Sequence, residues 1–84
     1  MTLTDALAQW ADQVAGVTMV RPSEVQNQLL GLLDLVGGEA RQDIERWLVG
    51  SLERSIYSQA EVNDMIATLA ARAEADLRAE APAG

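Results

Sequence analysis

The sequence predicts an all-α protein: a small four-helix bundle built from two helical hairpins and completed by self-association. Apolar residues recur every three to four positions in four segments, and two of the three short connectors carry glycine or proline. The 84 residues suffice for one domain, expected over residues 1–78, with residues 79–84 as a frayed tail. A chain this short buries only roughly 60–65% of its unfolded surface. Its apolar content relies on alanine and lacks phenylalanine, so burial against a second chain is expected.

The first predicted helix begins at a threonine and ends before the first glycine. Thr2 or Thr4 can cap this helix, and Asp5 lies where a negative charge favours a helix N-terminus. We expect Trp10 in this helix and Trp47 in the third predicted helix to lie in the core. The alternative is that each tryptophan is an exposed interface anchor. The inward stripe comprises Leu3, Leu7, Trp10 and Val14.

The stretch 23–54 predicts a helical hairpin. Ser23-x-x-Gln26 is typical of a capping box that starts a helix, and the pair Gly37-Gly38 is predicted to end that helix as its C-cap. The inward residues of its first helix are Val25, Leu29, Leu30, Leu32, Leu33 and Val36. Those of its second helix are Ala40, Ile44, Trp47, Leu48 and Leu52, with Trp47 inside the hairpin. The polar face carries Glu39, Arg41, Asp43, Glu45 and Arg46.

Residues 17–22 predict an extended connector before the hairpin. This segment is mostly β-branched or apolar, and Pro22 disfavours helical geometry at Arg21. Two interpretations remain open. The connector is either a strap that covers the open end of the helices or an exposed segment that a partner covers.

The last predicted helix begins after Ser58-x-x-Glu61, a second capping-box pattern. Its apolar stripe lasts about four turns, which favours an ordinary bundle helix over a coiled coil. The outer face is rich in alanine, which lets a neighbour approach closely, so we expect a self-association seam here. The inward residues are Val62, Met65, Ile66, Leu69, Ala70, Ala73 and Leu77.

The composition argues against an enzyme. The chain lacks histidine, cysteine and lysine, so serine or cysteine nucleophiles have no usual base, and zinc and di-iron sites lack their ligands. The closest acidic clusters, Glu39 with Asp43 and Glu74 with Asp76, are interpreted as solvated helix faces. We therefore predict no catalytic residues, no cofactor and no metal.

The net charge of −7 disfavours nucleic acids and anionic membranes and favours basic partners. The longest apolar stretch is too short for a membrane span, and the N-terminus lacks a secretory pattern, so a cytoplasmic location is expected. All six basic residues are arginine, which we interpret as the coding bias of a bacterial or phage genome of high GC content.

The run from Gly38 to Gly50 resembles the turn and recognition helix of helix-turn-helix regulators. The resemblance is carried by Ile44, the Arg46-Trp47-Leu48 run and the closing glycine. It implies a regulator that reads DNA with the helix 39–50, with three groove-facing candidates: Arg41, Gln42 and Arg46. The doubled glycine and the three acidic residues of this helix depart from that pattern.

The tripeptide Gly50-Ser51-Leu52 is similar to the Asp-Ser-Leu site of acyl carrier proteins, which are also small acidic four-helix domains. The resemblance implies a phosphopantetheine group on Ser51. However, the aspartate is missing and Ser51 falls inside a helical pattern, which favours a small residue on a packed face.

The leading hypothesis is a non-enzymatic helical protein–protein interaction module: a small subunit, adaptor or inhibitor with an acidic surface and an apolar stripe. The alternatives are the helix-turn-helix regulator and an acidic nucleic-acid mimic that occupies a basic groove. We expect a protein partner, a second copy in a homodimer, or both, and neither nucleic acid nor a membrane. The predicted interface residues are Val17, Met19, Val20, Arg41, Glu45, Arg54, Met65, Leu69 and Leu77.

Overall fold

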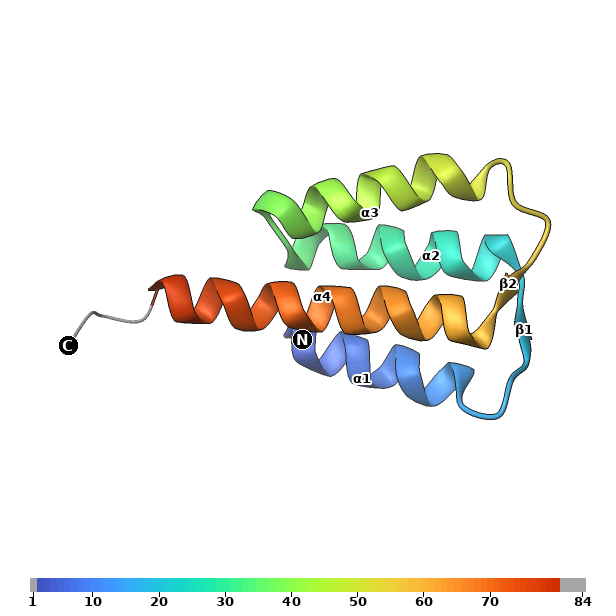
Figure 1. Cartoon of the computed structure of the whole chain (residues 1–84), viewed down its shortest axis with the longest axis horizontal. Helices are drawn as coiled ribbons and strands as arrows, with labels where there is room; N and C mark the ends of the chain where they lie inside the picture. Colours follow the sequence, from blue (N-terminus) through green and yellow to red (C-terminus); the bar gives the residue numbers. More distant parts are fainter. Residues whose placement is uncertain (1, 81–84) are drawn as a thin grey trace.

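The computed structural model describes residues 2–80, and the side chains of residues 2–75. The chain is mostly helical, as predicted, with a two-stranded sheet that was not predicted (Figure 1). In order, the elements are α1 (Leu3–Val14), β1 (Met19–Val20), α2 (Pro22–Leu32), the 3-10 turn η1 (Leu33–Leu35), α3 (Gly38–Ser51), β2 (Tyr57–Ser58) and α4 (Gln59–Glu80). Helix α4 therefore continues beyond residue 78, where the predicted domain ends, and residues 81–84 of the predicted tail lie outside the described residues.

The helices pack in two pairs. Helices α2 and α3 follow each other in the chain and lie side by side in opposite directions, whereas α1 packs against α4 from the other end of the chain (Figure 1). The predicted hairpin over residues 23–54 is therefore present, but the prediction of a second hairpin is wrong, because α1 and α4 are not consecutive. Contacts between α3 and α4 and between α1 and α2 join the two pairs. Each helix thus contributes to one common core.

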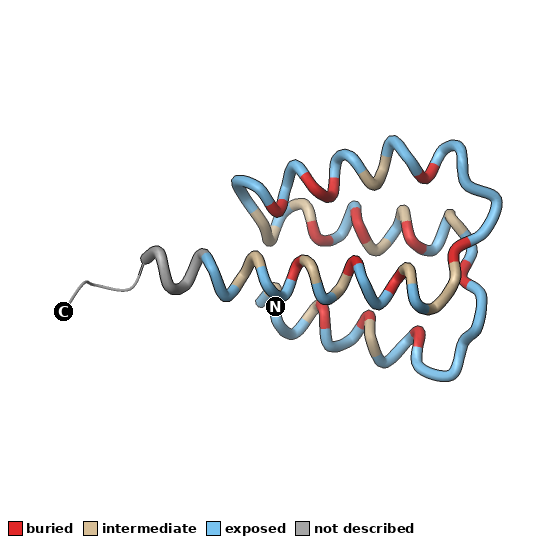
Figure 2. The backbone as a smooth tube through the Cα atoms, viewed as in Figure 1, coloured by how far each residue is buried: buried red, intermediate tan, exposed pale blue. Residues whose placement is uncertain are grey.

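The core consists mostly of the predicted apolar stripes, joined by Val20 and Tyr57 from the strands. The predictions that Leu30, Leu52 and Ala70 face inward are wrong, because all three are exposed. Buried positions recur at intervals of about one turn on every helix (Figure 2). Burying one large aliphatic side chain contributes roughly 1.5–3 kcal/mol relative to leaving it exposed. The buried apolar residues are Leu7, Trp10, Val14, Val20, Val25, Leu29, Leu32, Ala40, Ile44, Tyr57, Val62, Met65 and Leu69.

Two of the three predicted helix starts are confirmed. Thr2 caps α1, where its Oγ1 accepts a hydrogen bond of 3.2 Å from the backbone N–H of Asp5. At α4, Ser58 Oγ accepts from the Glu61 N–H (3.2 Å) and the Glu61 carboxylate accepts from the Ser58 N–H (3.1 Å), which completes the capping box.

The predicted cap of α2 at Ser23 and Gln26 is wrong. The helix starts at Pro22, because the first helical position needs no backbone N–H and suits the fixed φ of proline. The carboxylate of Glu24 accepts from the Arg21 N–H at 3.4 Å, so the reciprocal bond comes from a residue two positions earlier than predicted.

The glycine pair turns the chain, but not as the predicted C-cap. Helix α2 ends at Leu32 and passes into the turn η1. Gly37 is extended and precedes α3, and Gly38 is the first residue of α3 with φ of +57°. Only glycine adopts this left-handed conformation without a steric cost, so Gly38 permits the sharp entry into α3.

The predicted extended connector is confirmed, and part of it forms a strand that pairs with a second strand of the same chain. Strand β1 pairs antiparallel with β2, with Met19 opposite Ser58 and Val20 opposite Tyr57. The two strands lie across one end of the helices, where α1 and α3 end and α2 and α4 begin (Figure 1). Val20 and Tyr57 are buried, so this strap closes one end of the core.

Candidate functional site

An apolar patch, formed by Leu30, Leu48, Val49 and Leu52, lies on the outer side of the α2–α3 pair. Leu30 is 54% exposed, Val49 70% and Leu52 77%, while Leu48 is half-buried. Together with Gln26 these residues line one shallow depression of about 280 Å³. A contiguous group of exposed apolar side chains is a candidate interaction surface.

The helical phase of α3 explains why the patch is exposed. The positions of α3 that face inward are Ala40, Ile44, Trp47 and Ser51. They are spaced by three or four residues, so the next inward position after Trp47 is Ser51 and not Leu52. The prediction that Leu52 faces inward is therefore wrong, and so is that for Leu30, because α2 buries Val25, Leu29 and Leu32 instead. Trp47 is half-buried beside α4 and does not fill the interior of the hairpin.

A partly buried hydrogen-bond chain joins the two helices beside the patch. The side-chain amide of Gln26 donates to Ser51 Oγ at 3.0 Å, and Ser51 Oγ donates to the Leu48 carbonyl at 2.6 Å. These bonds join α2 to α3 and hold the patch residues at a fixed separation. Ser51 is buried, which confirms the packed-face interpretation and contradicts its role as an attachment point for phosphopantetheine, since the hydroxyl is inaccessible.

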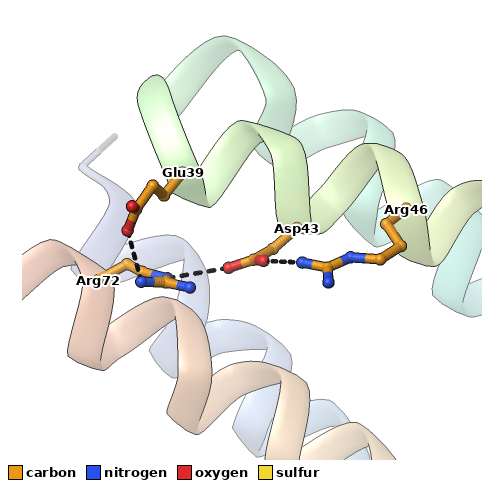
Figure 3. Close-up of polar contacts among 4 residues, drawn as sticks. All are labelled: Glu39, Asp43, Arg46 and Arg72. Atoms are coloured by element: carbon orange, nitrogen blue, oxygen red, sulfur yellow. Dashed lines mark hydrogen bonds and ion pairs between the residues drawn. The ribbon is translucent and has the colours of Figure 1, made fainter.

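The opposite side of α3 is held to α4 by ion pairs (Figure 3). Arg72 Nε donates to Asp43 at 3.0 Å and Arg72 Nη1 donates to Glu39 at 2.6 Å, while Arg46 pairs with the other oxygen of Asp43. Asp43 is only 4% exposed, so its interpretation as part of a solvated face is wrong. A buried carboxylate needs such partners, and this network fixes the orientation of α3.

The surroundings of the patch are acidic. Glu45 lies one turn before Leu48 and Val49 on α3, Glu53 directly follows Leu52, and Asp34 follows Leu30 by four residues. These three acidic residues are exposed. Arg41, one turn before Glu45 on α3, pairs with Glu45 at 3.2 Å.

A second surface lies between α3 and α4. The Arg54 guanidinium stacks over the Tyr57 ring, 4.5 Å from its centroid, and pairs with Glu61. The hydrogen bond from Arg54, together with that from the Ser58 N–H, lowers the pKa of the Glu61 carboxyl, and burial raises the pKa of the Tyr57 hydroxyl. Trp47 and Met65 complete the walls of this aromatic groove.

A third surface is a wider groove of about 600 Å³ between α1, β1 and α2. Trp10, Val14 and Val20 form its apolar floor, and the exposed Val17 and Met19 lie at its edge. Polar side chains from α1 and α2 make up the rest of its lining, including Gln13, which accepts a hydrogen bond of 2.6 Å from Gln28.

The predicted interface residues are not brought together on one surface. Arg41 and Glu45 lie beside the patch, Arg54 and Met65 line the aromatic groove, and Val17, Met19 and Val20 line the wider groove. The assignment of Leu69 is wrong, because it is fully buried in the core, and the side chain of Leu77 lies outside the described ones. Sequence reasoning missed Leu30, Val49 and Leu52, although the series 25–29–32 and 40–44–47–51 indicates that all three point outward.

The three DNA-contact candidates Arg41, Gln42 and Arg46 are exposed on α3. Both arginines are paired with acidic residues of the same helix. Helix α2 runs antiparallel beside α3 (Figure 1), whereas the two helices of a helix-turn-helix meet at about 90–120°.

No family model matches the sequence, and neither a curated protein nor a solved structure matches it. Within the described part of the chain, no helix is long and apolar enough to span a membrane. Among the same residues, no three acidic side chains gather closely enough to hold a metal ion.

Proposed function

We propose that the chain is a non-enzymatic protein–protein interaction module, a small subunit, adaptor or inhibitor that binds a partner through the patch on α2 and α3. One observation carries this proposal: Leu30, Val49 and Leu52 adjoin one another and are more than half exposed, while polar Asp43 and Ser51 of the same helix pair are buried. Burial of the patch by a partner supplies the driving force, and the charged residues around it orient the complex.

The rigid support of the patch adds to this proposal. The Gln26–Ser51 bond and the ion pairs of Asp43 hold α3 on two sides, so little conformational entropy is lost when a partner binds. A preformed apolar surface is typical of an adaptor that works without rearrangement.

The test compares two matched double variants in affinity capture from a lysate of the cells that produce the protein. Val49→Asp with Leu52→Asp places charges in the patch. Ala60→Asp with Asn63→Asp makes the same change in net charge at exposed residues of α4 that line none of the three surfaces. We expect a stoichiometric partner with the wild type and with the control, and its loss with the patch variant. An identical set of proteins from all three baits, or none from the wild type, contradicts the proposal.

Self-association of two chains, each with its own core of four helices, is proposed to use a different face from the patch. Alanines from α1 and α4 line a shallow apolar groove of about 270 Å³ on the outside of that pair, where a second copy can approach closely: Ala8, Ala11, Ala70 and Ala73. Light scattering over a range of concentrations should give the mass of a dimer, and Ala8→Glu with Ala70→Glu should give a monomer. If the wild type is a monomer at all concentrations, the proposed self-association through this groove is refuted.

The helix-turn-helix regulator and the nucleic-acid mimic remain alternatives, supported by the exposure of Arg41, Gln42 and Arg46 and by the net charge of −7 respectively. Duplex binding that weakens steeply with salt would favour the regulator. A salt-sensitive complex with a basic protein, unaffected by the patch variant, would favour the mimic.

A further inference from the structure

The shape of the patch favours a helix as its occupant. Its side chains come from α2 and α3, which lie side by side in opposite directions (Figure 1). The depression is lined by residues of both helices and by Leu52, which directly follows α3. A third helix can lay its apolar ridge into such a depression and contact both helices. An extended peptide lacks an equivalent site, because the backbone of α2 and α3 is used in helical hydrogen bonds and the strands β1 and β2 do not border the patch.

The charge around the patch favours a basic occupant. Asp34, Glu45 and Glu53 are exposed. The arginines closest to them in the chain are each engaged by an acidic side chain: Arg41 by Glu45, Arg46 by Asp43 and Arg54 by Glu61. The side chains of Asp34 and Glu53 form no ion pair among the described residues. Lysine or arginine at the flanks of an apolar ridge would complement them. A second copy of the chain would bring the same acidic surroundings, within a net charge of −7, against the patch.

We propose that the patch binds an amphipathic helix of a partner protein whose apolar ridge is flanked by lysine or arginine. This inference rests on the proposed function and specifies its partner. The apolar ridge covers Leu30, Val49 and Leu52, and the basic flanks meet Glu45 and Glu53.

Two synthetic helical peptides test the inference. Both carry the same leucine ridge, one flanked by lysine and the other by glutamate, and their dissociation constants are measured by fluorescence anisotropy. We expect the lysine peptide to bind at least about tenfold more tightly, because two or three exposed charge pairs of modest strength add up to that factor. The preference should shrink as the ionic strength rises, because exposed charges are screened.

Charge-reversed variants separate the local effect from the net charge. Glu45→Lys with Glu53→Lys should remove the preference for the lysine peptide. Asp12→Lys with Asp64→Lys makes the same change in net charge at exposed positions away from the patch and should retain the preference. Equal loss in both variants overturns the inference, because bulk charge would then be sufficient.

The outcomes for the partner and for the proposed function are distinct. If cellular capture depends on Val49 and Leu52 but the two peptides bind equally or fail to bind, the basic helix is wrong and the interaction module stands. If capture is unaffected by Val49→Asp with Leu52→Asp, the proposed function itself fails. Val49→Asp with Leu52→Asp should also abolish binding of the lysine peptide, and retained binding contradicts the location of the site.

Discussion

Helices α3 and α4 use their apolar residues in opposite ways. Helix α4 buries Val62, Met65 and Leu69 in one regular stripe. Helix α3 buries Asp43 and Ser51 and leaves valine and leucine in water at its C-terminal end. Disagreement between local pattern and burial tends to occur at functional sites. Under the proposed function, α4 therefore serves the stability of the fold, while α3 also presents the binding surface.

The largest expected effect comes from truncating one leucine on each side of this comparison. Leu69→Ala should lower the free energy of unfolding by about 2–5 kcal/mol, because it leaves a cavity in the core. Leu52→Ala removes the same atoms from a side chain that is 77% exposed and should change it by less than about 0.5 kcal/mol. Urea unfolding followed by circular dichroism measures both. Similar losses would show that Leu52 is part of the core after all.

A second comparison concerns the ion pairs on the two sides of α3. Arg72→Met removes hydrogen bonds to the buried Asp43 and should cost about 1–3 kcal/mol, towards the lower value because Arg72 is 40% exposed. Arg41→Met breaks the exposed pair with Glu45 and should cost about 0.5 kcal/mol or less. The same unfolding experiment measures both variants, and equal costs would contradict the orienting role of Asp43.

The smallest expected effect is the pH dependence at the start of α4. The bond from Arg54 lowers the pKa of Glu61, so this carboxylate stabilises the fold above about pH 4.5 and loses that contribution as the pH falls through its lowered pKa. Glu61→Gln should therefore be less stable than the wild type at neutral pH, and the difference should narrow between about pH 5 and pH 3. Glu53→Gln, at a side chain without an ion pair among the described residues, is the control. A difference that does not change with pH would refute this account.

The sequence predicted the helices well and their faces less well. Capping patterns located the starts of α1 and α4, and the periodicity identified all four helices, because both signals are local. The two-residue strands escaped prediction, because Met19 and Ser58 pair across 39 positions in the chain and carry too little local pattern.

The candidate site could be predicted only in part. Arg41 and Glu45 were correctly placed on an exposed face, but Leu30 and Leu52 were assigned to the core because apolar residues are expected there. For Asp43 the sequence predicts a surface position, because charged residues are expected there. Its partner Arg72 lies 29 positions away, and only tertiary packing brings the two together.

Photo-crosslinking in the producing cells tests the central claim most directly. A photoreactive phenylalanine analogue replaces Val49 in the patch or, as the control, the exposed Asn63 in α4. The account predicts one discrete covalent adduct with a partner protein from position 49 and none from position 63. An adduct from position 63 alone, or none from position 49, would contradict the claim that α3 presents the binding surface.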